Sequence, residues 1–303
     1  MTPAPRLLAI LGPTASGKSA VAMAVAAALP AEIVSCDSMQ VYRGLDIGTA
    51  KPTAAERQAV PHHLVDHVDL HAAYDVRRFL AEAEAAISEV LARGRWPILC
   101  GGTGLYAKAL LYGFDLRPSD PAVRQAVQAD LDADRDAVLA ELQAADPARA
   151  ALVAANDRYL VRAVEVLRLT GEAPTESRSE PPAACRDAAE FVLMPSAAES
   201  RRRIEARTHA MLAAGWIDEA RHAIAAGLLE TPTACQALGY RDIADYLEDD
   251  DSDLGALTDT LVTRTARYAK RQRTWFRNQH PRATTLPPGS PDALARTIIA
   301  ALA

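Results

Sequence analysis

Residues 12–19 constrain the fold of this 303-residue chain more than any other segment. They read Gly-Pro-Thr-Ala-Ser-Gly-Lys-Ser and match the GxxxxGK[ST] phosphate-binding pattern without a gap. In that pattern the glycines turn backbone N–H groups inward around phosphate oxygens, and the N-terminus of the next helix adds partial positive charge. We therefore expect a P-loop between a strand and a helix, with Lys18 beside the terminal phosphate and the Ser19 hydroxyl placed to bind Mg²⁺.

The segments around this loop alternate between short apolar runs and helical patterns. Apolar runs at 6–11, 32–36 and 96–100 predict strands. Helices are expected at 19–29 and at 74–93, where apolar residues recur at spacings of three and four. Such alternation is typical of a parallel sheet that binds ligands at the carboxyl ends of its strands. The sequence therefore predicts an α/β fold with a P-loop NTPase or kinase-like parallel sheet core.

The middle of the chain has a different character. Residues 118–171 are rich in Ala, Asp and Arg, and capping residues (Ser119 or Asp120, and Asn156 or Asp157) predict helices there. Beyond this region we expect a return strand at 191–195, helices at 198–226 and 253–279, and a tail made of a Pro-rich loop and a short helix. The predicted organisation is a core domain of residues 1–115 and 188–303, interrupted by a helical insertion domain of residues 116–187.

Composition narrows the class of protein. No apolar run approaches the roughly 18–20 residues that span a bilayer, and the apolar N-terminal stretch runs straight into the P-loop, so it indicates a strand and not a signal peptide. The four cysteines (Cys36, Cys100, Cys185 and Cys235) form no CxxC pair and no zinc spacing, which favours reduced thiols in a cytoplasmic protein. The net charge of −6 argues weakly against nucleic-acid binding.

The distribution of charge says more than its sum. Residues 262–282 hold seven Lys or Arg and no acid, whereas the stretch before them, 248–259, holds six acids and no base. Tyr268, Trp275 and Phe276 lie among the cations. Cations for phosphates together with flat rings for bases are typical of RNA binding. An ordinary amphipathic helix with buried aromatic rings is the alternative interpretation.

Several other segments are candidates for the site. Asp37 follows the second strand, where it could hold Mg²⁺ indirectly, orient a nucleophile or act as a general base, and capping of the next turn is the alternative. The Gly-rich loop at 44–52 fits a lid, a substrate loop or plain surface. Residues 101–104 allow close approach to a ligand or form a tight turn. Arg203 and Arg207 share a helix face and could reach a pyrophosphate or point into solvent.

Seven segments together resemble one family, the tRNA dimethylallyltransferases, also called tRNA isopentenyltransferases. They are GPTASGKS at 12–19, DSMQVYRGLDIGTAKPT at 37–53, PHHLVD at 61–66, GGTGLY at 101–106, RAVEVLRLTG at 162–171, ALGYRD at 237–242 and KRQRTWFR at 270–277. They follow the family's order and cover nearly the whole chain. The resemblance implies transfer of a dimethylallyl group from dimethylallyl diphosphate to N6 of adenosine 37 in tRNAs, with release of diphosphate.

The resemblance also implies roles for individual residues. Asp37 is the general base, and Thr14, Lys18 and Arg207 complete the catalytic group. Mg²⁺ is the cofactor, with Ser19 as its ligand. The pyrophosphate occupies the P-loop in place of a nucleotide, bound by Gly12, Pro13, Thr14, Ala15, Ser16, Gly17, Lys18 and Ser19. The tRNA-binding residues are Asp37, Ser38, Met39, Gln40, Thr103, Gln125, Arg158, Tyr159, Leu160, Val161, Arg162, Gly239, Tyr240 and Arg241.

In the family the helical insertion clamps the anticodon stem-loop of the tRNA. The resemblance implies a cytoplasmic monomer that does not contact a membrane. One position departs from the family pattern, because Tyr159 stands where members usually carry an arginine, ahead of Arg162. A tyrosine there puts one phosphate contact in doubt, although its ring could stack on a base.

Other functions compete for the P-loop. It fits a small-molecule or nucleotide kinase. It also fits an adenylate isopentenyltransferase, a related enzyme that uses a free nucleotide. The insertion and the basic C-terminal segment favour tRNA as the acceptor. A binding module without chemistry is a third class, which the intact Lys18, Ser19 and Asp37 argue against.

Overall fold

The computed structural model describes residues 6–113, 116–174, 186–249 and 253–302 of the chain. Cys185 and most of the segment that follows the last insertion helix lie outside the described residues. The chain divides into two compact units, one of Met1–Gly113 with Ala183–Ala303 and the other of Phe114–Pro182. Within the described residues, no helix combines the length and the apolar character that a membrane span requires.

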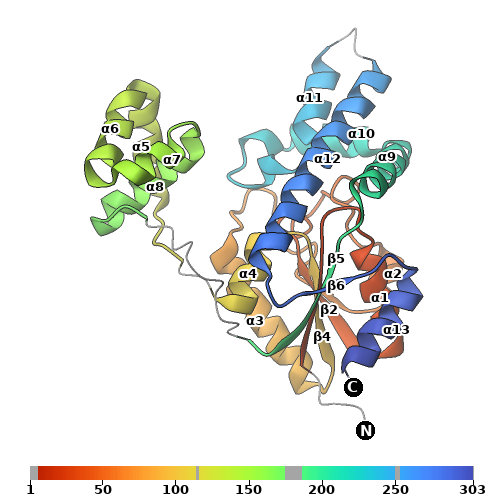
Figure 1. Ribbon diagram of the computed structural model, residues 1–303. Helices are drawn as coiled ribbons and strands as arrows, with labels where there is room; N and C mark the ends of the chain where they lie inside the picture. The colour runs from red at the N-terminus through yellow and green to blue at the C-terminus, as the bar shows by residue number, and fades with distance from the viewer. Residues whose placement is uncertain (1–5, 114–115, 175–185, 250–252, 303) are drawn as a thin grey trace. The chain divides into compact units, whose positions relative to one another are not determined.

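A parallel sheet of six strands forms the centre of the larger unit (Figure 1). Its strands are β1 (Leu7–Leu11), β2 (Ala31–Cys36), β3 (His62–His63), β4 (Trp96–Gly101), β5 (Ala188–Leu193) and β6 (Thr284–Leu286). They lie in the order β3-β2-β4-β1-β5-β6, and every pair of neighbours is parallel. All residues of β1, β2 and β4 are buried, as expected for central parallel strands covered on both faces. The prediction of an α/β fold with a parallel sheet is confirmed.

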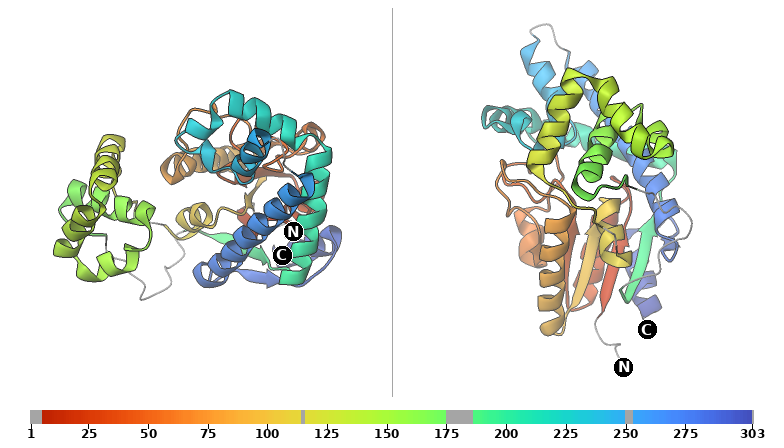
Figure 2. Two further views of the ribbon diagram at one scale, coloured as in Figure 1. Left: turned by 90° about the horizontal axis from the view of Figure 1, so that it is seen from above. Right: turned by 90° about the vertical axis from the view of Figure 1, so that its left-hand side faces the viewer.

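Helices pack on both faces of this sheet and above its carboxyl edge (Figures 1 and 2). They are α1 (Lys18–Ala28), α2 (Ala54–Ala59), α3 (Val76–Ala92), α4 (Gly104–Tyr112), α9 (Ala197–Ala213), α10 (Trp216–Ala225), α11 (Tyr240–Glu248), α12 (Leu254–Gln279) and α13 (Pro291–Leu302), with short 3₁₀ helices η1 (Leu228–Glu230) and η2 (Ala234–Gln236). Helices α9 and α12 lie side by side above the sheet. Both therefore stand over the edge at which parallel strands bind ligands.

The two faces of the sheet belong to two hydrophobic cores. Because side chains alternate along a strand, Leu7, Ala9 and Leu11 of β1 join the core that contains α3 and α4. Leu8 and Ile10 join the other core, which contains α1 and α13. A strand buried on both faces needs apolar residues at every position, which is why β1 reads as a continuous apolar run.

Most expected elements of this unit are present. The strands expected at 6–11, 32–36 and 96–100 are β1, β2 and β4, and the return strand expected at 191–195 begins earlier, at Ala188. The helices expected at 19–29 and 74–93 are α1 and α3. Strand β3 and helices α2 and α11 are not predicted by the sequence pattern. The prediction of a loop at residues 284–286 is wrong, because they form β6 beside β5.

The smaller unit is helical, as the composition of residues 118–171 indicated. It contains α5 (Pro121–Ala133), α6 (Arg135–Ala145), α7 (Pro147–Val153) and α8 (Asp157–Thr170). Asp120 caps α5 by accepting the Ala122 N–H over 2.8 Å, and Asn156 caps α8. The unit has its own hydrophobic core, formed by side chains such as Val127, Leu142 and Val164.

Candidate active site

The P-loop lies between β1 and α1 and is held by its own backbone. Ser16 N–H donates to the carbonyl of Pro13 over 3.2 Å, and Lys18 Nζ donates to the same carbonyl over 3.3 Å. Gly12 has a φ of 153°, and a Cβ at this position would lie 2.6 Å from the carbonyl oxygen of Leu193 on β5. Only glycine fits there without moving the neighbouring strand. The loop thus has the local geometry that the sequence pattern predicted.

A pocket of about 420 Å³ opens beside this loop. It is lined by Ala15, Ser16, Gly17, Lys18, Ser19, Val21, Leu193, Arg203, Arg207, Gly289, Pro291 and Leu294. Arg207 Nη2 donates to Thr14 Oγ1 over 2.6 Å, and Arg203 Nη1 donates to the carbonyl of Ser16 over 3.0 Å. Both arginines of α9 therefore reach the P-loop and do not simply face solvent. Guanidinium groups and the N-terminus of α1 meet at one place, which suits a polyanion.

The charges at this pocket are unbalanced. Burial lowers the pKa of Lys18, and the cation of Arg207 lowers it further, while Asp37 raises it. Burial also lowers the pKa of Arg207, and Asp37 again raises it. Two half-buried cations thus share one nearby carboxylate. A bound anion with several negative charges would balance these positive charges, because it stabilises the charged forms of both Lys18 and Arg207.

The two carboxylate oxygens of Asp37 have different surroundings. Oδ1 accepts the N–H groups of Met39 and Gln40 over 2.9 and 3.3 Å, so it caps the turn that follows β2. Oδ2 takes part in none of the hydrogen bonds among the described residues. Asp37 directly follows β2 and so lies at the same edge of the sheet as the P-loop, where its negative charge raises the pKa of Lys18 and of Arg207. Capping and a role in the site are therefore compatible.

The Gly-rich turn after β4 is tight because other backbone lies against it. A Cβ at Gly101 would lie 2.0 Å from the carbonyl oxygen of Cys36 on β2. Thr103 Oγ1 accepts the N–H of Ser38 over 3.1 Å, and Thr103 N–H donates to the carbonyl of Cys36 over 3.1 Å. The turn therefore holds the segment after β2 in place. Close packing between the ends of two neighbouring strands is therefore enough to explain a glycine in this turn, without a ligand.

The segment from Asp37 to Gln40, expected to contact tRNA, lies half-buried at the carboxyl edge of the sheet. The Gln40 amide is engaged within the protein, because it donates to the carbonyls of Thr49 and Ala50 over 3.2 and 3.0 Å. Gln40 therefore links this segment to the Gly-rich loop at 44–52.

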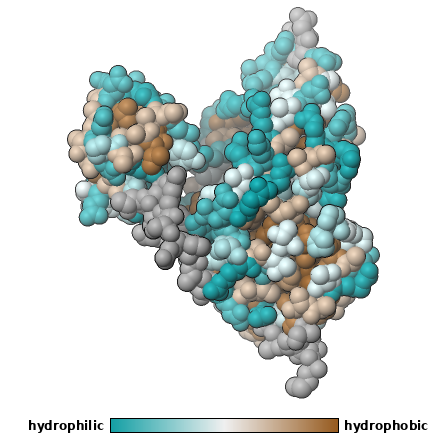
Figure 3. Space-filling model, in the orientation of Figure 1, coloured by the Kyte–Doolittle hydropathy of each residue, from teal (hydrophilic) through white to brown (hydrophobic). Residues whose placement is uncertain are grey.

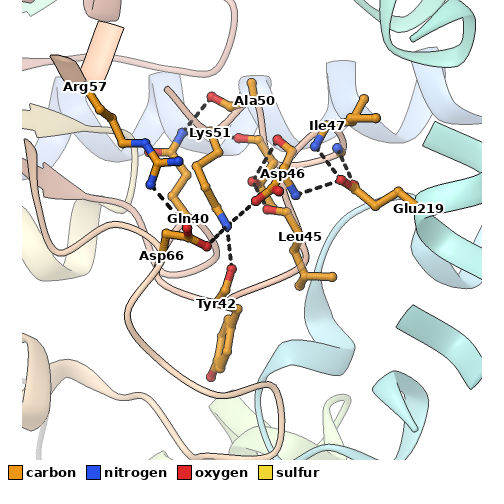
Figure 4. Close-up of polar contacts among 12 residues, drawn as sticks. Gln40, Tyr42, Leu45, Asp46, Ile47, Ala50, Lys51, Arg57, Asp66 and Glu219 are labelled. Carbon is orange, nitrogen blue, oxygen red and sulfur yellow. Dashed lines mark hydrogen bonds and ion pairs between the residues drawn. The ribbon is translucent and has the colours of Figure 1, made fainter. Parts of the chain in front are cut away.

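That Gly-rich loop is anchored to the core (Figure 4). The Glu219 carboxylate of α10 accepts three consecutive N–H groups of the loop, at positions 46–48, over 2.8, 2.7 and 2.9 Å. Lys51 is buried, and its ammonium donates to Asp66 Oδ1 over 2.8 Å. Among the interpretations open from the sequence, these contacts favour a fixed structural loop over a lid.

Of the expected tRNA contacts at 239–241, only Arg241 has an exposed side chain. Tyr240 is buried against Trp216, and its hydroxyl donates to Glu219 Oε1 over 2.6 Å. Gly239 has a φ of 92° and lies so close to Trp216 that a Cβ would come within 2.6 Å of the ring. The side chain of Tyr240 thus serves packing, and a contact of residues 239–241 with RNA stays a prediction.

The expected tRNA-binding residues of the insertion also separate by exposure. Gln125, Arg158 and Tyr159 are exposed, and 59% of the surface of Tyr159 is accessible to solvent. Leu160 and Val161 are buried in the unit's own core, so their side chains cannot meet RNA in this structure. Arg162 pairs with buried Glu165 over 2.8 Å and donates to the carbonyl of Pro118 over 3.0 Å.

One buried side chain at the P-loop was missed in the sequence. Gln272 of α12 accepts the Thr14 N–H at Oε1 over 2.8 Å and donates from Nε2 to the carbonyl of Gly102 over 2.8 Å. Its signal was available as periodicity, because Gln272 lies one turn from Tyr268 and from the buried Phe276 on the inner stripe of α12. A glutamine on a buried stripe needs hydrogen-bond partners.

The chemistry of the donor groups bears on a metal ion. No cluster of three or more His, Cys, Asp or Glu side chains in the described part of the chain could hold one. Among the described residues, the side-chain oxygens that line the pocket are the Ser16 and Ser19 hydroxyls, and Asp37 follows β2 at the same edge of the sheet. Mg²⁺ prefers oxygen ligands and commonly takes most of them from substrate phosphates and water. The residues present therefore fit an ion held chiefly by a bound pyrophosphate.

Two protein-family models match the chain. The model described as IPP transferase matches residues 40–279, and the model described as isopentenyl transferase matches residues 5–74. Together they span the P-loop, the segment after β2 and the arginines of α9. The first of them covers well over half of the chain and includes the smaller helical unit.

Known proteins agree with these matches. A tRNA dimethylallyltransferase of Deinococcus radiodurans is 46% identical over 91% of this chain and 91% of its own. The solved tRNA isopentenylpyrophosphate transferase of Bacillus halodurans is 36% identical, with a TM-score of 0.72 over 98% of this chain and 95% of that one. A eukaryotic dimethylallyltransferase acting on tRNA is 27% identical, with a TM-score of 0.77 over 93% of this chain and 73% of that one.

Proposed function

The chain belongs to the tRNA dimethylallyltransferase (IPP transferase) family, and from this premise we propose that it prenylates N6 of adenosine 37 in tRNA, using dimethylallyl diphosphate. Its activity as a tRNA dimethylallyltransferase follows from the family. The acceptor atom and the roles of individual residues are the proposal. The observation that carries it is the pocket beside the P-loop, which Lys18 and Arg207 line, with Asp37 following β2 at the same edge of the sheet.

The first requirement of the reaction is a leaving group. The bond between the allylic carbon and the diphosphate oxygen breaks, and its electron pair leaves with diphosphate. The allylic carbon can carry positive charge as this happens. Lys18, Arg207 and the N–H groups of the P-loop would stabilise the negative charge that grows on the departing oxygens. The imbalance of charge at the pocket supports this role.

The second requirement is removal of a proton. The N6 amino group is a poor nucleophile because its lone pair is delocalised into the adenine ring. As N6 bonds to the allylic carbon, Asp37 would accept the N6 proton, a contribution that is typically worth ~10²–10⁴ in rate. Oδ2 supports this role, since Oδ1 is already occupied by the capped turn.

Mg²⁺ is the proposed cofactor, and the Ser19 hydroxyl is its proposed protein ligand. A bound Mg²⁺ supplies positive charge that neutralises pyrophosphate oxygens. The fit of the oxygen donors to this ion supports the assignment.

The acceptor is proposed to be bound by two surfaces. The exposed cations of α12 would neutralise RNA phosphates, and the insertion would contact the anticodon stem-loop through exposed residues such as Arg158 and Tyr159. Extruding adenosine 37 from its stack requires a few kcal/mol, which contacts with the flipped base offset. We also propose that the enzyme acts as a cytoplasmic monomer.

Mass spectrometry of tRNA nucleosides tests this function. The protein is incubated with unmodified tRNA, Mg²⁺ and dimethylallyl diphosphate, and we expect the mass of one dimethylallyl group on adenosine 37 alone. Parallel reactions with ATP, and with AMP as acceptor, test the kinase and the adenylate isopentenyltransferase alternatives. Transfer to AMP without transfer to tRNA, or phosphate transfer from ATP, would overturn the proposal.

A further inference from the structure

One amide side chain of α12 connects two loops of the proposed active site. Gln272 holds the N–H of Thr14 and the carbonyl of Gly102, each over 2.8 Å. These two loops follow β1 and β4, neighbouring strands whose last residues Leu11 and Gly101 are in register. Both ends of the amide are thus used, and each end holds the loop of a different strand.

The surroundings of this amide leave little freedom. A Cβ at Gly102 would lie 2.7 Å from Gln272 Nε2, so the close approach depends on glycine. Tyr268 lies one turn earlier on α12, and burial raises the pKa of its hydroxyl. A buried amide that lost these partners would be destabilised. The position of α12 and the positions of both loops are therefore tied together.

The opposite face of the same helix is basic. The buried positions of its inner stripe include Leu261, Thr265, Ala269, Gln272 and Phe276. The exposed cations between them are Arg264, Arg267, Lys270, Arg271 and Arg277. Figure 3 shows the hydrophilic band that runs along this helix. One rigid element thus presents cations to solvent and Gln272 to the P-loop.

Resting on the proposed function, we infer that Gln272 is a positioning residue that couples tRNA binding on α12 to pyrophosphate binding in the P-loop. RNA that neutralises the exposed cations stabilises α12 in its seated position. Gln272 then holds Thr14, and Thr14 Oγ1 in turn accepts a hydrogen bond from Arg207 over 2.6 Å. Because coupling between two sites is reciprocal, pyrophosphate strengthens tRNA binding by the same factor.

Calorimetric titration of inorganic pyrophosphate with Mg²⁺ measures this coupling, with and without a saturating unmodified anticodon stem-loop. For the wild-type protein we expect the stem-loop to tighten pyrophosphate binding by about 5-fold or more, the lower end of common coupling factors. Gln272→Met keeps the volume and loses both hydrogen bonds, so the ratio should fall to within about twofold of unity. Thr265→Val, a matched change on the same buried stripe, should keep the wild-type ratio.

Two controls keep the outcome readable. Thermal unfolding shows whether Gln272→Met is folded, and Gln272→Ala serves as the second variant if it is not. An unchanged ratio in the folded variant, or a ratio of one in the wild-type protein, overturns the coupling. Failure of the proposed function would look different, because the wild-type protein would then bind pyrophosphate and transfer no dimethylallyl group to tRNA.

Discussion

At the scale of single residues, Asp37 allows its structural and chemical roles to be separated. Asparagine keeps an oxygen that accepts the N–H groups of Met39 and Gln40, but it cannot accept a proton. We expect Asp37→Asn to lower single-turnover prenyl transfer by at least ~10²-fold. The dissociation constant of tRNA, measured by filter binding, should stay within a few-fold of the wild-type value.

Asp37→Ala loses the cap as well as the carboxylate. Its rate of single-turnover prenyl transfer should therefore fall at least as far as that of the asparagine variant. A folded Asp37→Asn variant with near-normal transfer would remove this residue from the role of base. A large loss of tRNA binding in both variants would instead assign Asp37 to recognition of the acceptor.

Arg207 offers a test of the pyrophosphate site. Its guanidinium lines the pocket and donates to Thr14 Oγ1 over 2.6 Å. A hydrogen bond to a charged group contributes about 1.5–3 kcal/mol, so Arg207→Gln should lower kcat/KM for dimethylallyl diphosphate by roughly 10- to 100-fold. Arg202 on the same helix is exposed, pairs with Glu199 and is not among the residues that line the pocket. Arg202→Gln is therefore the matched control, and equal losses in both variants would contradict the assignment.

What the sequence could reveal about single residues depended on how local each signal was. The P-loop was predictable because its eight residues are contiguous and their spacing carries the chemistry. For Gln272 the periodicity of the helix could indicate burial but not its partner, since the Thr14 N–H that it binds lies 258 residues earlier in the chain. The same limit explains Tyr240, whose burial against Trp216 depends on packing between α10 and α11 that no short motif records.

At the scale of elements, β2 carries near its start a buried carboxylate that connects three segments. Glu32 accepts two hydrogen bonds from Arg93, over 3.0 and 2.7 Å, one from Arg95 over 3.3 Å, and lies 2.7 Å from His63 Nε2. The hydrogen bonds of Arg93 are the largest cause that lowers the pKa of Glu32 to about 2, with His63 and Arg95 adding to them against the effect of burial. These contacts join β2 to β3 and to the end of α3.

This low pKa predicts how stability depends on pH. A carboxylate with a lowered pKa in the folded state stabilises the protein above its ordinary pKa of 4.5, and this stabilisation is lost as the pH falls towards 2. We expect Glu32→Gln to lower the free energy of unfolding by about 2–3 kcal/mol at pH 7, and by progressively less below pH ~4.5. Urea unfolding at pH 7, 5, 4 and 3 measures the difference.

Glu89 provides the control for this experiment, because it also pairs with Arg93 but over 3.9 Å and with 67% of its side chain exposed. Glu89→Gln should change stability by less than about 1 kcal/mol at every pH, as expected for a surface ion pair. A difference between wild type and Glu32→Gln that stays constant with pH would show that its contribution is packing and not charge.

The predictability of elements followed their length and burial. Strands β1, β2 and β4 are apolar at nearly every position because helices cover both faces, so each produced a visible run. Strands β3 and β6 have two and three residues at the two edges of the sheet. Each pairs with one neighbour only, and that pairing depends on segments distant in sequence. The caps Asp120 and Asn156 were local signals, and the structure selects them from the two pairs that the sequence left open.

At the scale of the whole molecule, the chain leaves and re-enters the larger unit at adjacent points. The N–H of Arg186 donates to the carbonyl of Leu111 over 3.2 Å, immediately outside the helical insertion. Residues 186 and 187, which the sequence placed in the insertion, therefore belong to the larger unit. Each unit also has a hydrophobic core of its own. A short linker could close this gap with little loop entropy, so the insertion can be removed without cutting an element of the sheet.

We therefore expect a variant with residues 114–182 replaced by a short Gly-Ser linker to keep the larger unit folded. The described residues that line its P-loop pocket all belong to that unit, so calorimetry should show pyrophosphate binding within a few-fold of wild type. Transfer to tRNA should fall by at least ~10²-fold in kcat/KM, because each lost phosphate or stacking contact contributes on the order of 1–3 kcal/mol.

Residues 116–174 expressed alone should give helical circular dichroism, since their core is complete. Full transfer by the linker variant would mean that α12 and the larger unit recognise the anticodon stem-loop without the insertion, and loss of pyrophosphate binding would mean that the two units depend on one another to fold.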